Sequence, residues 1–136
     1  MQFITKQKGG QEMLVLGKKF NFDYAHFLPE YEGKCVRIHG HTGTLFVEIE
    51  GEINPKTGMI MDYKRLTEIV NKILDNIDHY LLNPIITPGP PTCENTIIWI
   101  KEKLEDDITR NHPGCKLHRL ELHEGLGGYC VWKKTL

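Results

Sequence analysis

The stretch Cys-Val-Arg-Ile-His-Gly-His at residues 35–41 constrains this chain more than any other, because it places two histidines two positions apart. Residues at i and i+2 of an extended strand point to the same face, so His39 and His41 are expected to lie side by side. Gly40 lets the backbone bend, or lets a bound group come close. Two neutral imidazoles that converge suit a metal ion, most often zinc. The spacing therefore predicts a strand that carries two metal ligands.

A third ligand is expected from His26, in the Tyr-Ala-His-Phe-Leu stretch just upstream. Three histidines with one open position are typical of a catalytic zinc site, whereas structural zinc sites are closed. The alternative is that all three are ordinary strand histidines, hydrogen-bonded to their neighbours. Cys35 is expected close to this metal, where its thiolate can act on a bound group. The alternative for Cys35 is an inert buried thiol.

Composition sets the class of protein. A length of 136 residues predicts one domain with a real core. The net charge of −1 gives no sign of a nucleic-acid or membrane-surface partner. We expect a cytoplasmic protein, because the N-terminal residues lack the apolar core of a signal peptide. The four cysteines are then free thiols, and Cys93, Cys115 and Cys130 are expected to be structural.

Alternating apolar residues predict four strands. The first spans about 13–28, with a bulge near Gly17, and the second spans about 41–53. The last two, about 116–124 and 128–134, flank a Gly-Leu-Gly-Gly hairpin at 125–128. Residues 1–12 are polar and are expected to form a loose arm.

Two helices are predicted between these strand pairs. The first has Asp62 near its N-cap and apolar residues at helical spacing from Leu66 to Ile77. The proline-rich segment 84–91 cannot continue it. Thr92 is expected to cap a second helix that runs to about Thr109. The order ββααββ predicts an α+β domain with antiparallel strand pairs.

Five ordered motifs together resemble a known family. They are His26 in a strand, Cys35-x3-His39-Gly40-His41, residues 58–63 (GMIMDY), Asp78-His79-x2-Leu82-Asn83, and Pro91-Thr92-x-Glu94-Asn95. The set resembles the 6-pyruvoyltetrahydropterin synthase superfamily, most of all its bacterial and archaeal branch, 6-carboxy-5,6,7,8-tetrahydropterin synthase of the queuosine pathway. The likeness covers roughly residues 18–133.

The resemblance implies a tunnelling fold, in which trimers close strands into a barrel and two barrels stack into a hexamer. It implies that His26, His39 and His41 hold zinc, and that the open zinc position takes the side-chain hydroxyls of a dihydropterin triphosphate. Zinc makes those oxygens and the adjacent C–H bonds more acidic. The implied reaction converts 7,8-dihydroneopterin triphosphate to 6-carboxytetrahydropterin, acetaldehyde and triphosphate.

The resemblance also assigns roles to the remaining site residues. Cys35 is implied as the general base, partnered by the Asp78-His79 pair from a neighbouring subunit; by local sequence alone, that pair would only end a helix. Glu124 is implied as the carboxylate that anchors the amino-pyrimidine ring, with Glu121 as a rival on the surface. Thr92 and Glu94 either line the same pocket or only cap a helix. Tyr24 stands where the family pattern has a small residue.

Three other functions stay open. One is 6-pyruvoyltetrahydropterin synthase proper, with the same site and no loss of the two-carbon fragment; the three-residue gap between Cys35 and His39 favours the carboxy-forming branch. Another is a folate-serving branch with a glutamate near the cysteine position, which the presence of Cys35 argues against. The last is a metal- or pterin-binding module without turnover.

Overall fold

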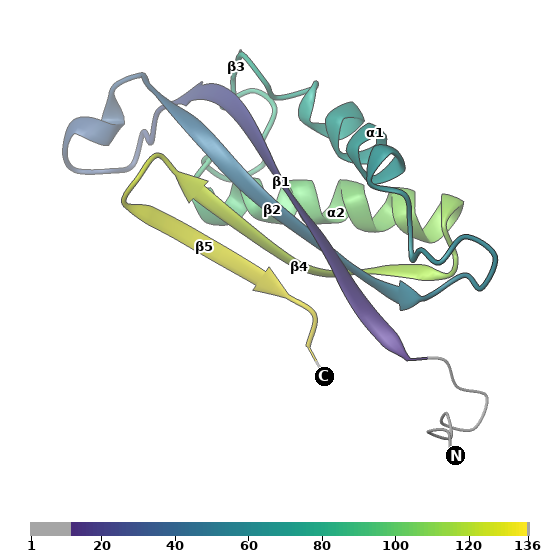
Figure 1. Cartoon of the computed structure of the whole chain (residues 1–136). Coiled ribbons are helices and arrows are strands. Elements are labelled where there is room, and N and C mark those ends of the chain that lie inside the picture. The colour runs from purple at the N-terminus through teal and green to yellow at the C-terminus, as the bar shows by residue number, and fades with distance from the viewer. Residues whose placement is uncertain (1–11, 136) are drawn as a thin grey trace.

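The structure is a computed structural model that describes residues 12–135. The predicted loose arm therefore lies outside the described residues, apart from an exposed Glu12. The elements are β1 (Met13–His26), the short 3₁₀ helix η1 (Lys34–Val36), β2 (His39–Glu52), α1 (Tyr63–Leu74), β3 (Tyr80–Leu81), α2 (Cys93–Asn111), β4 (Cys115–Glu124) and β5 (Gly128–Lys133). The five strands form one sheet in the order β3-β1-β2-β4-β5, and both α-helices cover the same face of it (Figure 1).

The predicted α+β architecture is confirmed, with one addition. The two-residue strand β3, between the helices, pairs in parallel with β1 through Tyr24 and Ala25, whereas every other strand pair is antiparallel. Sequence periodicity cannot reveal a strand of two residues, because an alternation of apolar and polar residues is recognisable only over at least four residues.

The predicted bulge near Gly17 is wrong. The pairing of β1 with β2 runs unbroken from Met13 opposite Glu52 to His26 opposite His39. The register shifts instead between β2 and β4, at Glu48 and Ile49. Gly17 has another reason to be small, because a Cβ there would lie 3.2 Å from Cγ of Glu48 on the neighbouring strand.

Both helices begin where the capping residues predict. The Asp62 carboxylate accepts a hydrogen bond from the Lys64 amide at 2.8 Å, and the Thr92 hydroxyl accepts one from the Asn95 amide at 3.1 Å. Each bond satisfies a backbone N–H that has no partner within the helix. The helix α1 ends at Leu74, three residues before the last predicted position.

One core joins the sheet to the helices. The inward positions of β1, β2 and β4 alternate with exposed ones, and they pack against the apolar faces of α1 and α2. Its fully buried members include Leu45, Val47, Ile49, Leu66, Ile100, Leu104, Leu120 and Leu122. No helix among the described residues is long and apolar enough to cross a membrane.

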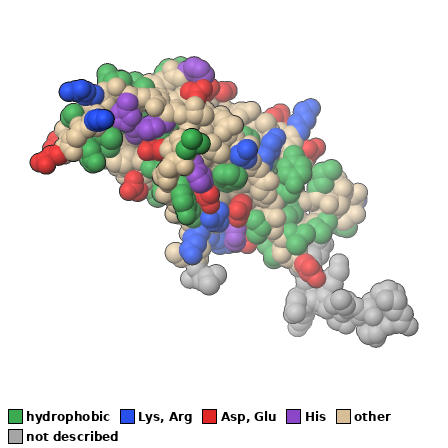
Figure 2. All heavy atoms as spheres, turned by 60° about the vertical axis from the view of Figure 1, so that its left-hand side comes forward, with side chains coloured by type: hydrophobic (Ala, Val, Ile, Leu, Met, Phe, Trp, Pro, Cys, Tyr) green, Lys and Arg blue, Asp and Glu red, His purple; other side chains and the backbone are tan. Residues whose placement is uncertain are grey.

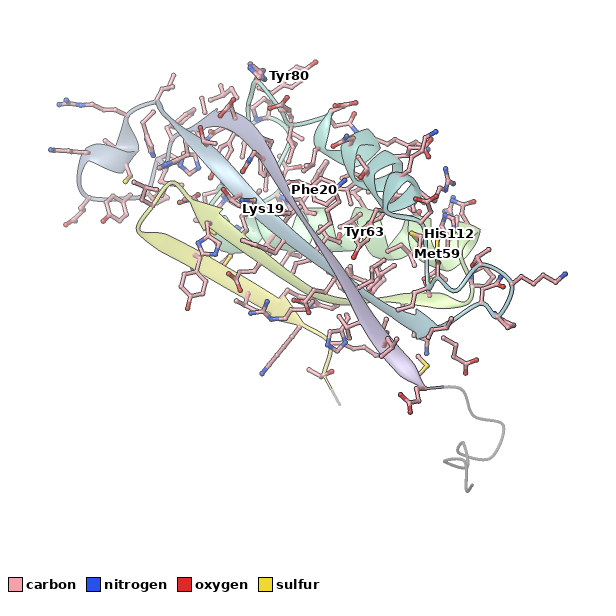
Figure 3. All side chains as sticks on the ribbon, in the orientation of Figure 1. Lys19, Phe20, Met59, Tyr63, Tyr80 and His112 are labelled. Carbon is pink, nitrogen blue, oxygen red and sulfur yellow. The ribbon has the colours of Figure 1, made fainter. Side chains whose placement is uncertain are left out.

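The topology brings four chain segments to one end of the sheet. β1 ends there at His26, β2 begins at His39, β4 ends at Glu124 and α2 begins at Cys93. In Figure 3, Tyr80 on β3 marks this end of the sheet, whereas Met59, Tyr63 and His112 lie toward the opposite end.

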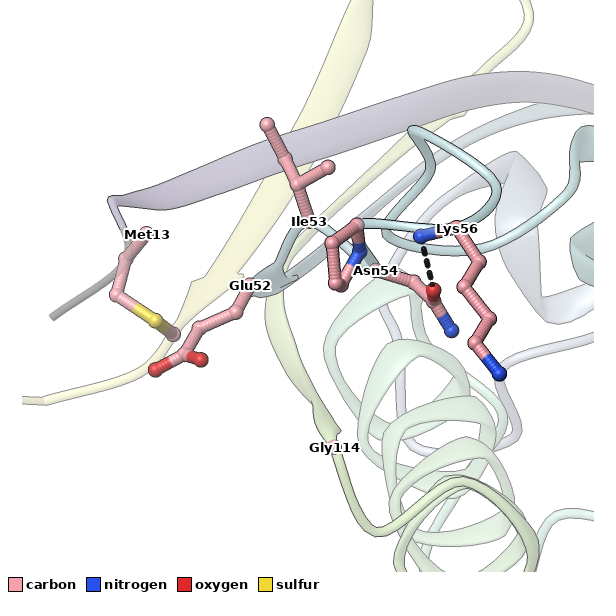
Figure 4. A pocket seen from close by; sticks show the side chains of 7 residues that line it. Met13, Glu52, Ile53, Asn54, Lys56 and Gly114 are labelled. Carbon is pink, nitrogen blue, oxygen red and sulfur yellow. Dashed lines mark hydrogen bonds between the residues drawn. The ribbon is translucent and has the colours of Figure 1, made fainter. Parts of the chain in front are cut away.

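An open pocket lies at the other end of the sheet, where Met13 begins β1 and Glu52 ends β2 (Figure 4). The turn after β2 forms its rim, and there the Lys56 amide donates to the Asn54 side chain at 2.9 Å. None of the predicted site residues lines this pocket.

Candidate metal centre and active site

The three predicted histidines converge. The ring centroids lie 4.6 Å apart for His26 and His39, 5.0 Å for His26 and His41, and 4.9 Å for His39 and His41. One nitrogen of each ring lies within 4.8 Å of the other two. His26 is buried, and the other two are half-buried, so the group opens to solvent on one side. Figure 2 shows histidine side chains gathered at this end of the molecule.

Two of the rings are oriented by backbone carbonyls. Nδ1 of His26 lies 2.7 Å from the carbonyl oxygen of Pro91, and Nδ1 of His39 lies 2.8 Å from that of Arg37. A carbonyl can only accept, so both Nδ1 atoms carry the proton and both Nε2 atoms keep a free lone pair. Metal-binding histidines are typically fixed in this way.

The donor set fits a divalent metal with a preference for imidazole. The three ring nitrogens lie within 4.8 Å of one another, so one ion held between them could contact all three. Three protein ligands leave one position for a bound group. The residues present therefore make a candidate metal centre with an open site.

Glu124 lies beside this centre on the same face of the sheet. Its Oε1 accepts a hydrogen bond from the Tyr24 hydroxyl at 2.9 Å. Burial, followed by the charge of Glu124, raises the pKa of Tyr24 far above its usual range, so the phenol keeps its proton. Burial also lowers the pKa of His41, and the Glu124 carboxylate acts in the opposite direction. Glu124 is thus close enough to His41 to influence its charge.

Glu121 points away from this site. It lies on the outer face of β4, where it forms ion pairs with Arg119 at 2.7 Å and with His123 at 2.5 Å. These partners already satisfy both carboxylate oxygens. The strand alternation therefore leaves Glu124 as the carboxylate beside the histidines.

Cys35 lies on η1, in the loop that leads into β2, and is half-buried. The backbone hydrogen bond from the Leu28 amide to the Cys35 carbonyl, at 2.7 Å, closes this loop against the end of β1. Among residues 12–135, no hydrogen bond or ion pair joins Cys35 to Asp78 or His79. The structure thus places Cys35 near the start of β2 without bringing the predicted Asp78–His79 pair to it.

Asp78 and His79 form a surface pair. Nδ1 of His79 lies 3.1 Å from Oδ1 of Asp78, and their side chains are 75% and 36% exposed. The backbone N–H of Asp23 donates to Asp78 at 2.8 Å, and this bond, followed by His79, lowers the pKa of Asp78. His79 has φ = 66°, a left-handed conformation that is costly for a residue with a Cβ, and its amide donates to the Asp23 carbonyl. Asp23 therefore holds both members of the pair in place.

The sequence predicts that Thr92 and Glu94 either line the pocket or only cap a helix. In the structure both occupy capping positions at the start of α2. The hydroxyl of Thr92 is engaged at the start of α2, and the exposed Glu94 lies in the first helical turn. Thr92 nevertheless follows Pro91 directly, and the Pro91 carbonyl contacts His26, so α2 begins at the edge of the candidate metal centre. The cap thereby fixes the Pro91 carbonyl that orients His26.

Sequence reasoning missed two contacts next to this site. The Tyr24 hydroxyl reaches Glu124, and the thiols of Cys93 and Cys130 lie 3.0 Å apart. The hydrogen bond to Cys130, together with burial, raises the pKa of Cys93. The period-two spacing of Tyr24 and His26 indicates that both lie on one face of the strand, but it does not indicate the contact with Glu124. Nothing in the sequence links the two cysteines, which lie on different elements.

The fold and site together define an α+β protein with a candidate three-histidine metal centre that opens to solvent on one side. Comparison with known proteins gives the family. Residues 15–134 match the family model described as 6-pyruvoyl tetrahydropterin synthase. The chain belongs to the 6-pyruvoyl tetrahydropterin synthase family.

Curated relatives and a solved structure agree with this assignment. The chain is 38% identical to a 6-carboxy-5,6,7,8-tetrahydropterin synthase of Synechocystis, over 82% of this chain and 87% of that protein. It is 42% identical to a dihydroneopterin monophosphate aldolase of Pyrococcus furiosus, over 77% and 84%. The structure of Caenorhabditis elegans 6-pyruvoyl tetrahydropterin synthase superposes with a TM-score of 0.81 at 25% identity, over 91% of this chain and 97% of that one. The family and fold expected from the sequence motifs are confirmed.

Proposed function

We propose that this chain is a cytoplasmic, zinc-dependent 6-carboxy-5,6,7,8-tetrahydropterin synthase of the queuosine pathway. It takes 7,8-dihydroneopterin triphosphate and water to 6-carboxytetrahydropterin, acetaldehyde and triphosphate. The observation that carries this proposal is the convergence of His26, His39 and His41 beside Glu124 on one face of the sheet. The name of the Synechocystis relative supports the choice within the family.

The roles of the residues follow from their chemistry. A zinc ion held by the three histidines would supply Lewis-acid polarisation of the substrate's side-chain oxygens. Glu124 accepts two parallel N–H bonds from the amino-pyrimidine ring and so fixes its orientation. Cys35 removes a proton from the side chain of the substrate. Thr92 and Glu94 line the approach from the start of α2.

Asp78 and His79 complete the site from a second protomer in this proposal. The pair is hydrogen-bonded to the Asp23 backbone, His79 is exposed, and neither residue has a bond to Cys35 within the described residues of its own chain. A carboxylate that holds an imidazole in one tautomer makes an effective proton carrier once a thiol is brought to it. We therefore propose a homohexamer built as a dimer of trimers, which native mass spectrometry tests directly.

The experiment that tests the reaction is mass spectrometry of the products formed from 7,8-dihydroneopterin triphosphate by the zinc-loaded protein. We expect 6-carboxytetrahydropterin and acetaldehyde from the wild type and neither from Cys35→Ala. Cys115→Ala is the matched control, because it removes a buried thiol outside the site. A 6-pyruvoyl product would assign the sister activity, and no product from the wild type would leave only a metal- or pterin-binding module.

A second candidate is an aldolase, favoured by the 42% identity to the Pyrococcus furiosus relative. The same site suits it, because a metal that polarises a hydroxyl and a base that removes its proton also promote carbon–carbon cleavage. Incubation with dihydroneopterin monophosphate separates the two. Release of a two-carbon aldehyde phosphate with a hydroxymethyl pterin would assign the aldolase in place of the synthase.

A further inference from the structure

Tyr24 links the metal centre to the anchoring carboxylate. It lies on β1 two residues before His26 and directly opposite His41 on β2. Its ring centroid is 5.4 Å from that of His26 and 5.7 Å from that of His41. Its hydroxyl crosses to β4 and donates to Oε1 of Glu124 at 2.9 Å. The Tyr24 side chain, which is only 4% exposed, therefore lies between the histidines and the Glu124 carboxylate.

Gly43 makes this crossing possible. It lies on β2 directly opposite Glu124 on β4. A Cβ at Gly43 would lie 2.9 Å from Cε1 of Phe22 and 3.1 Å from Cε1 of Tyr24. The two aromatic rings stack with centroids 5.2 Å apart and fill the space that Gly43 leaves free. The position of the Tyr24 ring is therefore set by packing before any ligand binds.

The hydrogen bond leaves Glu124 able to bind a ligand. An ionised carboxylate has about four lone-pair directions, and the Tyr24 hydroxyl uses one of them. One direction on each oxygen remains for two parallel N–H donors. A free glutamate side chain has several rotamers, which ligand binding would have to restrict. The hydrogen bond from the buried Tyr24 hydroxyl restricts them in advance.

We propose that Tyr24 is a positioning residue that orients Glu124 toward the amino-pyrimidine ring, and that it thereby sets the selectivity for ligands that carry a 2-amino group. This inference rests on the proposed function, since it takes Glu124 as the anchor of the ring. It predicts that the Tyr24 hydroxyl contributes to ring discrimination through Glu124 and not through the metal.

The test uses two stable, fluorescent probes, pterin and lumazine, which differ in carrying an amino or an oxo group at position 2. Their dissociation constants are measured for the zinc-loaded protein by fluorescence titration. We expect Tyr24→Phe, which keeps the ring and removes only the hydroxyl, to weaken pterin binding about tenfold, the scale of a hydrogen bond to a charged group. Lumazine binding should change less, so the ratio of the two affinities falls. Zinc content should stay the same.

The matched control is Tyr129→Phe, which removes a hydroxyl from an exposed tyrosine on β5 and should leave both affinities unchanged. The coupling is tested in a Glu124→Ala background, which removes the acceptor, so that Tyr24→Phe should have no further effect on pterin binding. Gly43→Ala keeps the tyrosine but displaces its ring, and it should lower the affinity ratio as Tyr24→Phe does.

Three results would overturn the inference in distinguishable ways. If the wild type binds pterin and Tyr24→Phe keeps both the affinity and the ratio, Tyr24 does not position Glu124, and the proposed function stands. If the zinc-loaded wild type binds no pterin, the proposed ring site fails, and the role of Tyr24 fails with it. An effect of Tyr24→Phe that persists in full without the Glu124 carboxylate would mean that the hydroxyl acts by another route.

Discussion

Replacing His26 by alanine should abolish the stabilisation of this protein by zinc. A ligand that binds only the native state at 100 times its dissociation constant stabilises it by about 2.7 kcal/mol. The chain has 136 residues, and about 2.1 cal/mol/K for each gives an unfolding entropy of about 0.29 kcal/mol/K. Zinc at that concentration should therefore raise the Tm of the wild type by about 9 °C.

The variant should lose nearly all of this rise. His26 is the most buried of the three ligands, and its Nδ1–H is held by the Pro91 carbonyl, so no neighbouring ring can replace it. If the affinity falls about 100-fold, the same zinc concentration equals the new dissociation constant, and the stabilisation drops to about 0.4 kcal/mol. The expected rise in Tm is then about 1 °C.

The assay is differential scanning calorimetry with zinc and with a chelator. Each variant is compared with its own chelated form, so the cavity left by the missing imidazole cancels. His112→Ala is the matched control, because His112 lies toward the other end of the sheet (Figure 3), and we expect it to keep the full rise. A zinc-dependent rise in His26→Ala equal to that of the wild type would refute the assignment of His26 as a ligand.

Three further predictions concern stability. Thr92→Ala removes the acceptor for the Asn95 amide and should lower the free energy of unfolding by about 1 kcal/mol in urea denaturation, whereas Thr92→Ser should cost much less. The Asp23 amide lowers the pKa of Asp78 below its unfolded value of about 3.9, so this carboxylate stabilises the fold at neutral pH, and the contribution is lost as the pH falls through the folded pKa. The difference in unfolding free energy between the wild type and Asp78→Asn should accordingly be largest above about pH 5 and should vanish in acid; a difference independent of pH would contradict this. Leu45→Ala empties a fully buried position on β2 and should cost about 2–5 kcal/mol by the same measurement.

Local patterns were sufficient for most of the secondary structure. Alternation predicted the four long strands, and capping residues predicted where both helices begin, because these signals act over a few neighbouring residues. The end of α1 was overestimated, since Ile77 continues the apolar spacing but is buried in the turns that follow the helix. The strand β3 and the bulge between β2 and β4 depend on partners far along the chain.

In the candidate site, too, some features follow from local sequence and others depend on distant segments. The two-residue spacing of His39 and His41 predicted that they share a strand face. The family resemblance added the roles of Cys35, Asp78 and Glu124. The contact of the Tyr24 hydroxyl with Glu124 joins residues 100 positions apart, and no local spacing could have indicated it.

The sequence by itself determined the strand periods, the helix starts and the shared face of His39 and His41, because each depends on side chains that are close along the chain. Only the tertiary structure decided which carboxylate faces the histidines, since the register of β4 against β2 turns Glu124 inward and Glu121 outward. The same holds for the contact between the Cys93 and Cys130 thiols and for the hydrogen bonds that hold Asp78 and His79 against Asp23. These features arise from the packing of distant segments, which is set by burial of the whole core and not by any short pattern of residues.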